Sequence, residues 1–259
     1  MLSVELDDNG MRPSASTASA LSGLYVYEVE RDMPRIAIPR SETHLVVRFG
    51  PSARGGLDIH AFGAQEKAHR KQLRAGQRMV MARLRLGAQI AVFGVPASAL
   101  AGRIVSLEGL WGQAATGRLV EELEASPSTW QAAAVLERAV AARIANAAFH
   151  ARPSLALKAA AKLTDASVNV VADELGVSER HLRRVFREAV GVSPKAFARL
   201  ARFHRALSVA RADAQANWAS IATTVGYYDQ AHLIADFRLI AGATPQTLLG
   251  ELRARPSGA

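Results

Sequence analysis

The chain has 259 residues, of which 49% are hydrophobic, so it is long enough for two modest domains and too apolar to be disordered throughout. It contains no cysteine, which excludes disulfides, thiolate metal sites and cysteine nucleophiles. The net charge of +9 and a pI near 10.6 favour an anionic partner, either nucleic acid or an anionic membrane surface.

The first 125 residues or so carry a strand-rich pattern. Segments rich in β-branched and aromatic residues predict strands over 24–30, 43–49, 57–62 and 79–86. Turns are expected between them at Met33-Pro34, Gly50-Pro51, Gly55-Gly56 and Gly76. Helical patterns follow over 96–100, 113–125 and 128–147, the last with Ser128 as its expected N-cap and with Leu136, Val140 and Ile144 in one stripe.

From about residue 154 the pattern is wholly helical. It predicts seven helices, over 154–165, 168–175, 178–189, 194–212, 217–225, 229–240 and 245–253. We therefore predict an α+β chain with a strand-rich, sensor-type domain and its trailing helices over 1–150, followed by an all-α domain over 151–259. The first dozen residues and the tail from 253 to 259 are expected to be loose.

One pattern occurs twice in this helical part. The first copy runs from Val171-Ala172 through Gly176 to Ser193-Pro194, and the second from Ile221-Ala222 through Gly226 to Thr244-Pro245. Each copy has a small residue, a glycine turn, a helix with apolar spacing and a capped exit, in the order found in a helix-turn-helix. Two copies in tandem indicate a protein that reads DNA.

The first copy carries a cationic helix. With Leu182 and Phe186 turned inward, the four arginines of that helix must point outward; they are Arg180, Arg183, Arg184 and Arg187. An arginine can bond a guanine edge bidentately or anchor a phosphate. Between residues 180 and 211 there are nine basic residues and a single acid, Glu188, so binding should depend steeply on salt. A solvated arginine face on a purely structural motif is the alternative, and the second copy with matched caps disfavours it.

The helix over 194–212 separates the two copies. A single helix of this length can hold two reading helices about one DNA turn apart on one face of the duplex. A monomer could then span two successive segments of the major groove.

Residues from about 154 to 252 resemble the DNA-binding domain of the AraC/XylS family of bacterial transcription regulators. The resemblance is carried by Val171-Ala172, Leu175-Gly176-Val177-Ser178, Arg180, Leu182-Arg183-Arg184, Phe186, Gly191, Ser193-Pro194, Ile221-Ala222, Val225-Gly226-Tyr227, Asp229-Gln230, His232-Leu233, Phe237, Gly242 and Thr244-Pro245. It implies two recognition helices in adjacent major grooves, and a regulator that recruits or excludes RNA polymerase at promoters.

The resemblance also implies the DNA-contacting residues. The first reading helix would use Glu179, Arg180, Arg183 and Arg184, and the second Gln230, Ala231, His232 and Ala235. To these we add Ser178, Arg187, Arg202 and Arg238 as DNA-binding candidates. Many relatives carry a cation near the position of Ala235, whereas Arg238 is the only arginine or lysine of this helix. We therefore expect the first reading helix to dominate affinity and base recognition.

The N-terminal half has a weaker resemblance, carried by residues 83–88, 93–96 and 107–112, to an uncharacterised domain of AraC-type regulators. It is a candidate effector-binding or dimerisation domain, and its ligand residues stay unknown. One candidate pocket is formed by Tyr25, Tyr27, Arg48, Arg83, Arg85 and Trp111, which could equally be core aromatics and solvated arginines. His44, His60 and His69 lack metal-ligand spacing, so no metal is expected. The apolar stripe of 128–147 either pairs with another subunit in a homodimer or packs back on its own domain.

The sequence also bears on other classes of function. Known enzyme fusions of this DNA-binding module need a cysteine, and no other catalytic motif is visible, so we expect neither an enzyme nor a cofactor. A non-specific architectural DNA binder without an effector is the remaining alternative. We predict a sequence-specific transcription regulator, modulated by a small molecule or a partner, that binds double-stranded promoter DNA and RNA polymerase. The acidic start, unlike a signal peptide, and the absence of a long apolar run predict a cytoplasmic, nucleoid-associated protein that does not enter a membrane.

Overall fold

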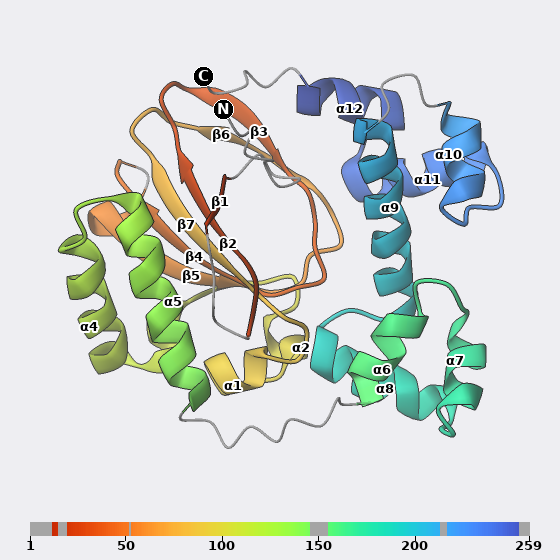
Figure 1. The fold of residues 1–259 in the computed structure, drawn as a ribbon, viewed down its shortest axis with the longest axis horizontal. Helices are drawn as coiled ribbons and strands as arrows, with labels where there is room; N and C mark the ends of the chain where they lie inside the picture. Colours follow the sequence, from red (N-terminus) through yellow and green to blue (C-terminus); the bar gives the residue numbers. More distant parts are fainter. Residues whose placement is uncertain (1–11, 15–19, 52, 146–154, 213–216, 254–259) are drawn as a thin grey trace.

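The computed structural model describes residues 12–14, 20–51, 53–145, 155–212 and 217–253. A strand-rich N-terminal part with trailing helices is followed by an all-helical part, which confirms the predicted fold class (Figure 1). Of the ends expected to be loose, residues 1–11 and 254–259 lie outside the described residues, while Arg12 begins a strand and Arg253 ends a helix.

The N-terminal part is built on a six-stranded antiparallel sheet. Its strand order is β1 (Arg12–Ser14), β2 (Leu21–Glu28), β7 (Arg78–Leu84), β4 (His44–Phe49), β5 (Leu57–Phe62) and β8 (Ile104–Ser106). Successive side chains of a strand point to opposite faces. Leu45 and Val47 of β4, with Val80 of β7, are fully buried on one face, where the trailing helices α4 (Gln113–Glu124) and α5 (Thr129–Ala145) cover the sheet (Figure 1).

A separate two-stranded ribbon pairs β3 (Met33–Ala37) with β6 (His69–Leu73). The prediction of a turn at Met33-Pro34 is therefore wrong. Pro34 lies inside β3, opposite Gln72. Both strands of a two-stranded ribbon are edge strands, the position in a sheet where proline is tolerated.

Short helices complete this part of the chain. They are the 3-10 turn η1 (Arg54–Gly56), α1 (Gln89–Phe93), α2 (Ala97–Leu100) and α3 (Leu107–Trp111). The structure confirms Ser128 as a cap, since its Oγ accepts from the Gln131 N–H at 3.2 Å. Leu136 and Val140 are fully buried in the core beneath the sheet, with Ile144 packed against it. The apolar stripe thus packs back on its own domain; residues 146–147 of the predicted helix lie outside the described residues.

The C-terminal part contains the seven predicted helices within a few residues of their expected bounds. They are α6 (Leu155–Lys162), α7 (Val168–Glu174), α8 (Glu179–Val190), α9 (Pro194–Ala212), α10 (Trp218–Thr224), α11 (Gln230–Ala241) and α12 (Pro245–Arg253). One core surrounds Leu182 and Phe186, and another surrounds Leu233 and Phe237. The predicted domain boundary near 150–153 lies outside the described residues.

The two parts of the chain share both of these cores. Ile36 and Ile38, in and just after β3, are buried in the core of α9–α12, and Ala64 is buried in the core of α6–α8. The ribbon lies beside α9 and α12 in Figure 1. No helix in the described ranges is long and apolar enough to cross a bilayer.

Candidate nucleic-acid interface

The helix α8 is shaped by the residues that flank it. Gly176 turns the chain with a φ of +66°, a conformation that costs glycine little. The Oγ of Ser178 then accepts from the His181 N–H at 3.2 Å and so caps the helix. Leu182 and Phe186 are fully buried on one side. The opposite side is solvent-exposed and carries Arg180, Arg183, Arg184 and Arg187.

Two of these arginines have partners one turn away on the same helix. Arg183 Nε donates to Glu179 Oε1 at 2.8 Å, and Arg184 lies 3.6 Å from a carboxylate oxygen of Glu188. Exposed ion pairs of this spacing contribute only about 0.3–0.5 kcal/mol. Both guanidinium groups therefore lie along the helix face. Each can readily exchange its carboxylate partner for a phosphate or a base edge.

The equivalent helix α11 presents a much less charged face. Asp229 caps it by accepting from the His232 N–H at 2.7 Å, and Leu233 and Phe237 are fully buried. Its exposed residues include all the predicted contacts, which are Gln230, Ala231, His232, Ala235 and Arg238. The structure thus exposes these predicted residues of α11 together, with one arginine among them.

Tyr228 was missed by the sequence analysis. It directly precedes the Asp229 cap of α11, and 92% of its surface is exposed. Its neighbour Tyr227 is buried. The two adjacent tyrosines before α11 thus have opposite surroundings, one in the core and the other in solvent.

A buried polar cluster lies behind α11. Asp236 is 7% exposed, and burial raises the pKa of its carboxyl although the charges of His232, Arg199 and Arg202 act in the opposite direction. Burial and the nearby Asp236 carboxylate also raise the pKa of the Tyr227 phenol. The guanidinium of Arg202 lies 5.5 Å from the centre of the Tyr227 ring. Arg202, predicted as a DNA-binding residue, is thus half-buried against the second motif.

A groove of about 650 Å³ runs between the two motifs. One wall is the turn between α6 and α7 with Glu179 and Arg183, and the other is the turn between α10 and α11 at residues 223–226. Three cations of α9 line it, namely Lys195, Arg202 and Arg205. Arg205 is held by Asp165 at 2.9 Å and by the carbonyl of Thr164 at 2.7 Å. The groove therefore joins the cationic face of α8 to the turn of the second motif.

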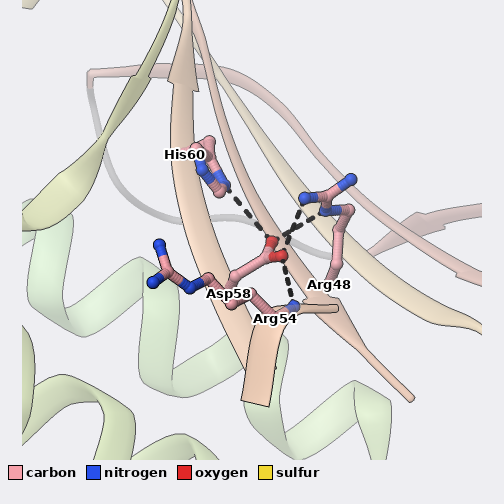
Figure 2. Close-up of polar contacts among 4 residues, drawn as sticks. All are labelled: Arg48, Arg54, Asp58 and His60. Atoms are coloured by element: carbon pink, nitrogen blue, oxygen red, sulfur yellow. Dashed lines mark hydrogen bonds and ion pairs between the residues drawn. The ribbon is translucent and has the colours of Figure 1, made fainter. Parts of the chain in front are cut away.

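The candidate pocket residues of the N-terminal part do not form one site. Arg83 stacks on Tyr25, with its Cζ 4.5 Å from the ring centre. Arg48 donates two hydrogen bonds of 2.7 Å to the carboxylate of Asp58. The same carboxylate is also contacted by His60 and by the Arg54 N–H (Figure 2). Tyr25, Tyr27, Arg48 and Arg83 share the sheet face opposite the helices. Arg85 is exposed, and Trp111 donates to the Val92 carbonyl at 2.8 Å within the other layer. The six residues therefore do not line one pocket, because the sheet separates Trp111 from the four residues on the other face.

The three histidines have different surroundings. Burial and the nearby charge of Arg83 lower the pKa of His44 to about 3. His60 Nδ1 lies 3.2 Å from Asp58 Oδ1 on the same sheet face, and His69 is exposed on β6. Within the described ranges, no three His, Cys, Asp or Glu side chains gather as metal ligands would.

The chain is similar to several solved structures. It is similar to the C-terminal domain of AraT, a response regulator from Geobacillus stearothermophilus, at 23% identity and a TM-score of 0.36, over 40% of this chain and 89% of that one. It is similar to ToxT from Vibrio cholerae strain SCE256 with a bound unsaturated fatty acid, at 10% identity and a TM-score of 0.47, over 91% of this chain and 97% of that one. It is similar to the AraC-like transcriptional activator CuxR at 15% identity and a TM-score of 0.22, over 71% of this chain and 73% of that one.

The family comparison locates the similarity within the chain. Curated protein sequences give no match. The model of a helix-turn-helix domain family matches residues 171–251, which span both motifs and the helix α9 between them. Residues 171–251 are thus a helix-turn-helix domain.

Proposed function

We propose that this protein is a sequence-specific, DNA-binding transcription regulator that reads promoter DNA with α8 and α11. The observation that carries the proposal is the exposed face of α8, where four arginines stand on the side opposite Leu182 and Phe186. A helix of this charge fits the major groove, where arginine can bond O6 and N7 of guanine.

The two reading helices have unequal tasks. Glu179, Arg180, Arg183 and Arg184 of α8 are the proposed base-reading residues, with Ser178 and Arg187 at the backbone. Gln230, Ala231, His232 and Ala235 of α11 face DNA without a strong cation, and Arg238 reaches a phosphate. Most of the affinity should therefore come from α8, and α11 should add contacts that depend on sequence, such as a thymine methyl against Ala231 or Ala235.

The groove between the motifs is the proposed seat of the DNA backbone. Between two successive major-groove segments, a phosphodiester strand must cross the protein surface. Lys195, Arg202 and Arg205 line the groove at this point and supply the positive charge. Such contacts position the protein on the duplex without carrying sequence information.

The N-terminal half is proposed as the modulating domain, over residues 1–150, with the DNA-binding domain over 151–259. Its burial of Ile36, Ile38 and Ala64 against both DNA-binding cores gives it a direct physical connection to the reader. A small molecule or protein bound by this half could act through that contact, and ToxT shows a fatty acid bound to a protein of similar architecture. RNA polymerase is the proposed target at the promoter, and a homodimer through this half is a further proposal.

The function is tested by selecting bound sites from random double-stranded DNA with the full chain, followed by binding measurements over a salt series. We expect an enriched motif with two blocks about one helical turn apart. We also expect log K to fall linearly with log salt concentration, with a slope of about −0.9 for each phosphate neutralised. Strong, salt-sensitive binding with no enriched motif, with or without effector candidates, would favour the architectural alternative.

A further inference from the structure

The C-terminal ends of the two reading helices are equivalent positions of the repeat. Helix α8 ends at Val190 and α11 at Ala241, and each is followed by a left-handed glycine, Gly191 with a φ of +91° and Gly242 with a φ of +66°. The last four carbonyls of a helix have no partner within it. Donors from elsewhere in the chain can therefore hold a helix by this end.

The N-terminal part supplies such a donor to α8. Gln89, the first residue of α1, is 3% exposed and donates its Nε2–H to the carbonyl of Ala189. The surrounding contact is close. A Cβ placed on Gly191 would lie 3.1 Å from the carbonyl oxygen of Ala97 in α2. The end of α8 is thus seated directly on α1 and α2.

The N-terminal part holds α11 at the same point. The Ala68 N–H donates to the carbonyl of Ile240 at 2.7 Å, and Arg70 Nη1 donates to that of Ala241 at 2.9 Å. Arg70 also forms an ion pair with Glu251 of α12, with Nε and Oε2 3.1 Å apart. When the two copies are aligned on their C-terminal glycines, Ile240 corresponds to Ala189. The same carbonyl is therefore bonded by the N-terminal part in both motifs.

The helix between the motifs is contacted from the same side. His204 Nε2 lies 2.8 Å from the carbonyl oxygen of Pro39, and Arg199 lies 3.3 Å from a carboxylate oxygen of Glu66. Residues from 36 to 101 thus touch α8, α9 and α11. A long helix on its own bends gently, whereas three separate attachments to one body fix three helices in space.

We propose that Gln89 and Arg70 are positioning residues for DNA recognition. They hold the C-terminal ends of α8 and α11, so that the N-terminal part, and not α9 alone, sets the separation and angle of the two reading helices. The consequence for DNA rests on the proposed function, but the placement of the helices does not.

The placement is tested with spin labels in the full chain. Because the chain has no cysteine, Glu188→Cys and Leu239→Cys can be labelled selectively; they are equivalent positions of the repeat, and both are exposed. Pulsed electron paramagnetic resonance should give one narrow distance distribution. Adding Gln89→Leu and Arg70→Leu, which remove the donors and keep much of the side-chain volume, should broaden or shift it.

A matched control separates this contact from the neighbouring ion pair. Glu251→Gln removes the partner charge of Arg70 and leaves the bond to the Ala241 carbonyl, so the distribution should stay narrow. Gln89→Leu alone should have a larger effect than Arg70→Leu alone, because the Ala68 N–H still holds α11. If the doubly substituted protein unfolds cooperatively and keeps the original distribution, α9 alone sets the placement and the proposal is overturned. If that protein does not fold, Gln89→Ala with Arg70→Ala replaces it.

A second readout uses DNA with the selected motif. Adding or removing one base pair between the two blocks should weaken binding by the native protein, and Gln89→Leu with Arg70→Leu should reduce this penalty by about 2- to 30-fold in affinity. A purely structural role would lower affinity for every spacing alike and would contradict the proposal. If no motif exists, the proposed function fails while the label experiment still decides the placement.

Discussion

Arg183 and Arg202 differ in their surroundings, and so should their contributions to DNA binding. Arg183 stands exposed on α8, whereas Arg202 is half-buried on α9 and lines the groove between the motifs. We expect Arg183→Ala to cost about 1–3 kcal/mol with the selected motif and little with random DNA. Arg202→Ala should weaken binding to both DNAs about equally.

The measurement is the dissociation constant for both DNAs at one salt concentration. Arg118→Ala, which removes an exposed arginine of α4, controls for the loss of one positive charge and should change neither value. Equal losses for Arg183→Ala and Arg202→Ala on both DNAs would refute the assignment of roles.

Asp236 predicts a pH dependence of stability. Since burial raises its pKa in the folded state, the ionised carboxylate destabilises the fold above that pKa, and this cost disappears as pH falls towards the unfolded value of about 4. Asp236→Asn should therefore raise Tm at neutral pH, by an amount that shrinks in acid. Asp165→Asn should show the opposite sign, because bonds from Thr164 and Arg205 lower the pKa of Asp165. A gain for Asp236→Asn that does not change with pH would contradict this account.

Single residues also show what the sequence could reveal about the site. The outward direction of the α8 arginines could be predicted, because Leu182 and Phe186 fix the buried side of a helix with 3.6 residues per turn. The burial of Asp236 could not, because it depends on the packing of α11 against α9, which the pattern of α11 alone does not show. The donors to Ala189 and Ile240 are a side chain and a backbone N–H more than 90 residues away, which no local pattern records.

At the scale of elements, α9 and α12 match their predicted bounds and the other helices of the C-terminal part nearly do, because caps and glycines mark their ends. The strands are harder to predict from the sequence than the helices. β5 was predicted with its true ends, whereas the ribbon strands β3 and β6 were missed. β6 reads His-Arg-Lys-Gln-Leu and lacks the alternation of a half-buried strand, since it pairs with β3 alone and exposes four of its five residues.

The two left-handed glycines that flank α8 differ in the space available for a side chain. Gly176 and Gly191 both have positive φ, but a Cβ would meet nothing within 4 Å at Gly176 and would meet Ala97 O at 3.1 Å at Gly191. Gly176→Ala should cost about 1–2 kcal/mol of unfolding free energy from backbone strain. Gly191→Ala should cost more, because α2 must also move. Denaturant titration measures both; equal losses would mean that α2 yields freely at this contact.

At the scale of the whole molecule, the C-terminal part combines cores of its own with a shared surface. The two cores around Phe186 and Phe237 consist mainly of residues after 154. We therefore expect a fragment of residues 154–259 to be helical and to unfold cooperatively. Its Tm should be lower than that of the full chain, because it leaves uncovered the apolar surface that Ile36, Ile38 and Ala64 occupy. A fragment whose circular dichroism melts without cooperativity would refute this.

The shared core has a consequence for the order in which the chain is made. The ribbon strands are complete at Leu73, while the last helix of the core that buries Ile36 ends at Arg253. At ribosomal rates of 5–20 residues per second, roughly 10 to 40 s separate the two events. During this interval the helices that bury Ile36 and Ile38 are incomplete, so the nascent ribbon presents both side chains to solvent. The newly synthesised chain should therefore depend on chaperones, and substitution of Ile38 by a polar residue should reduce its capture by them.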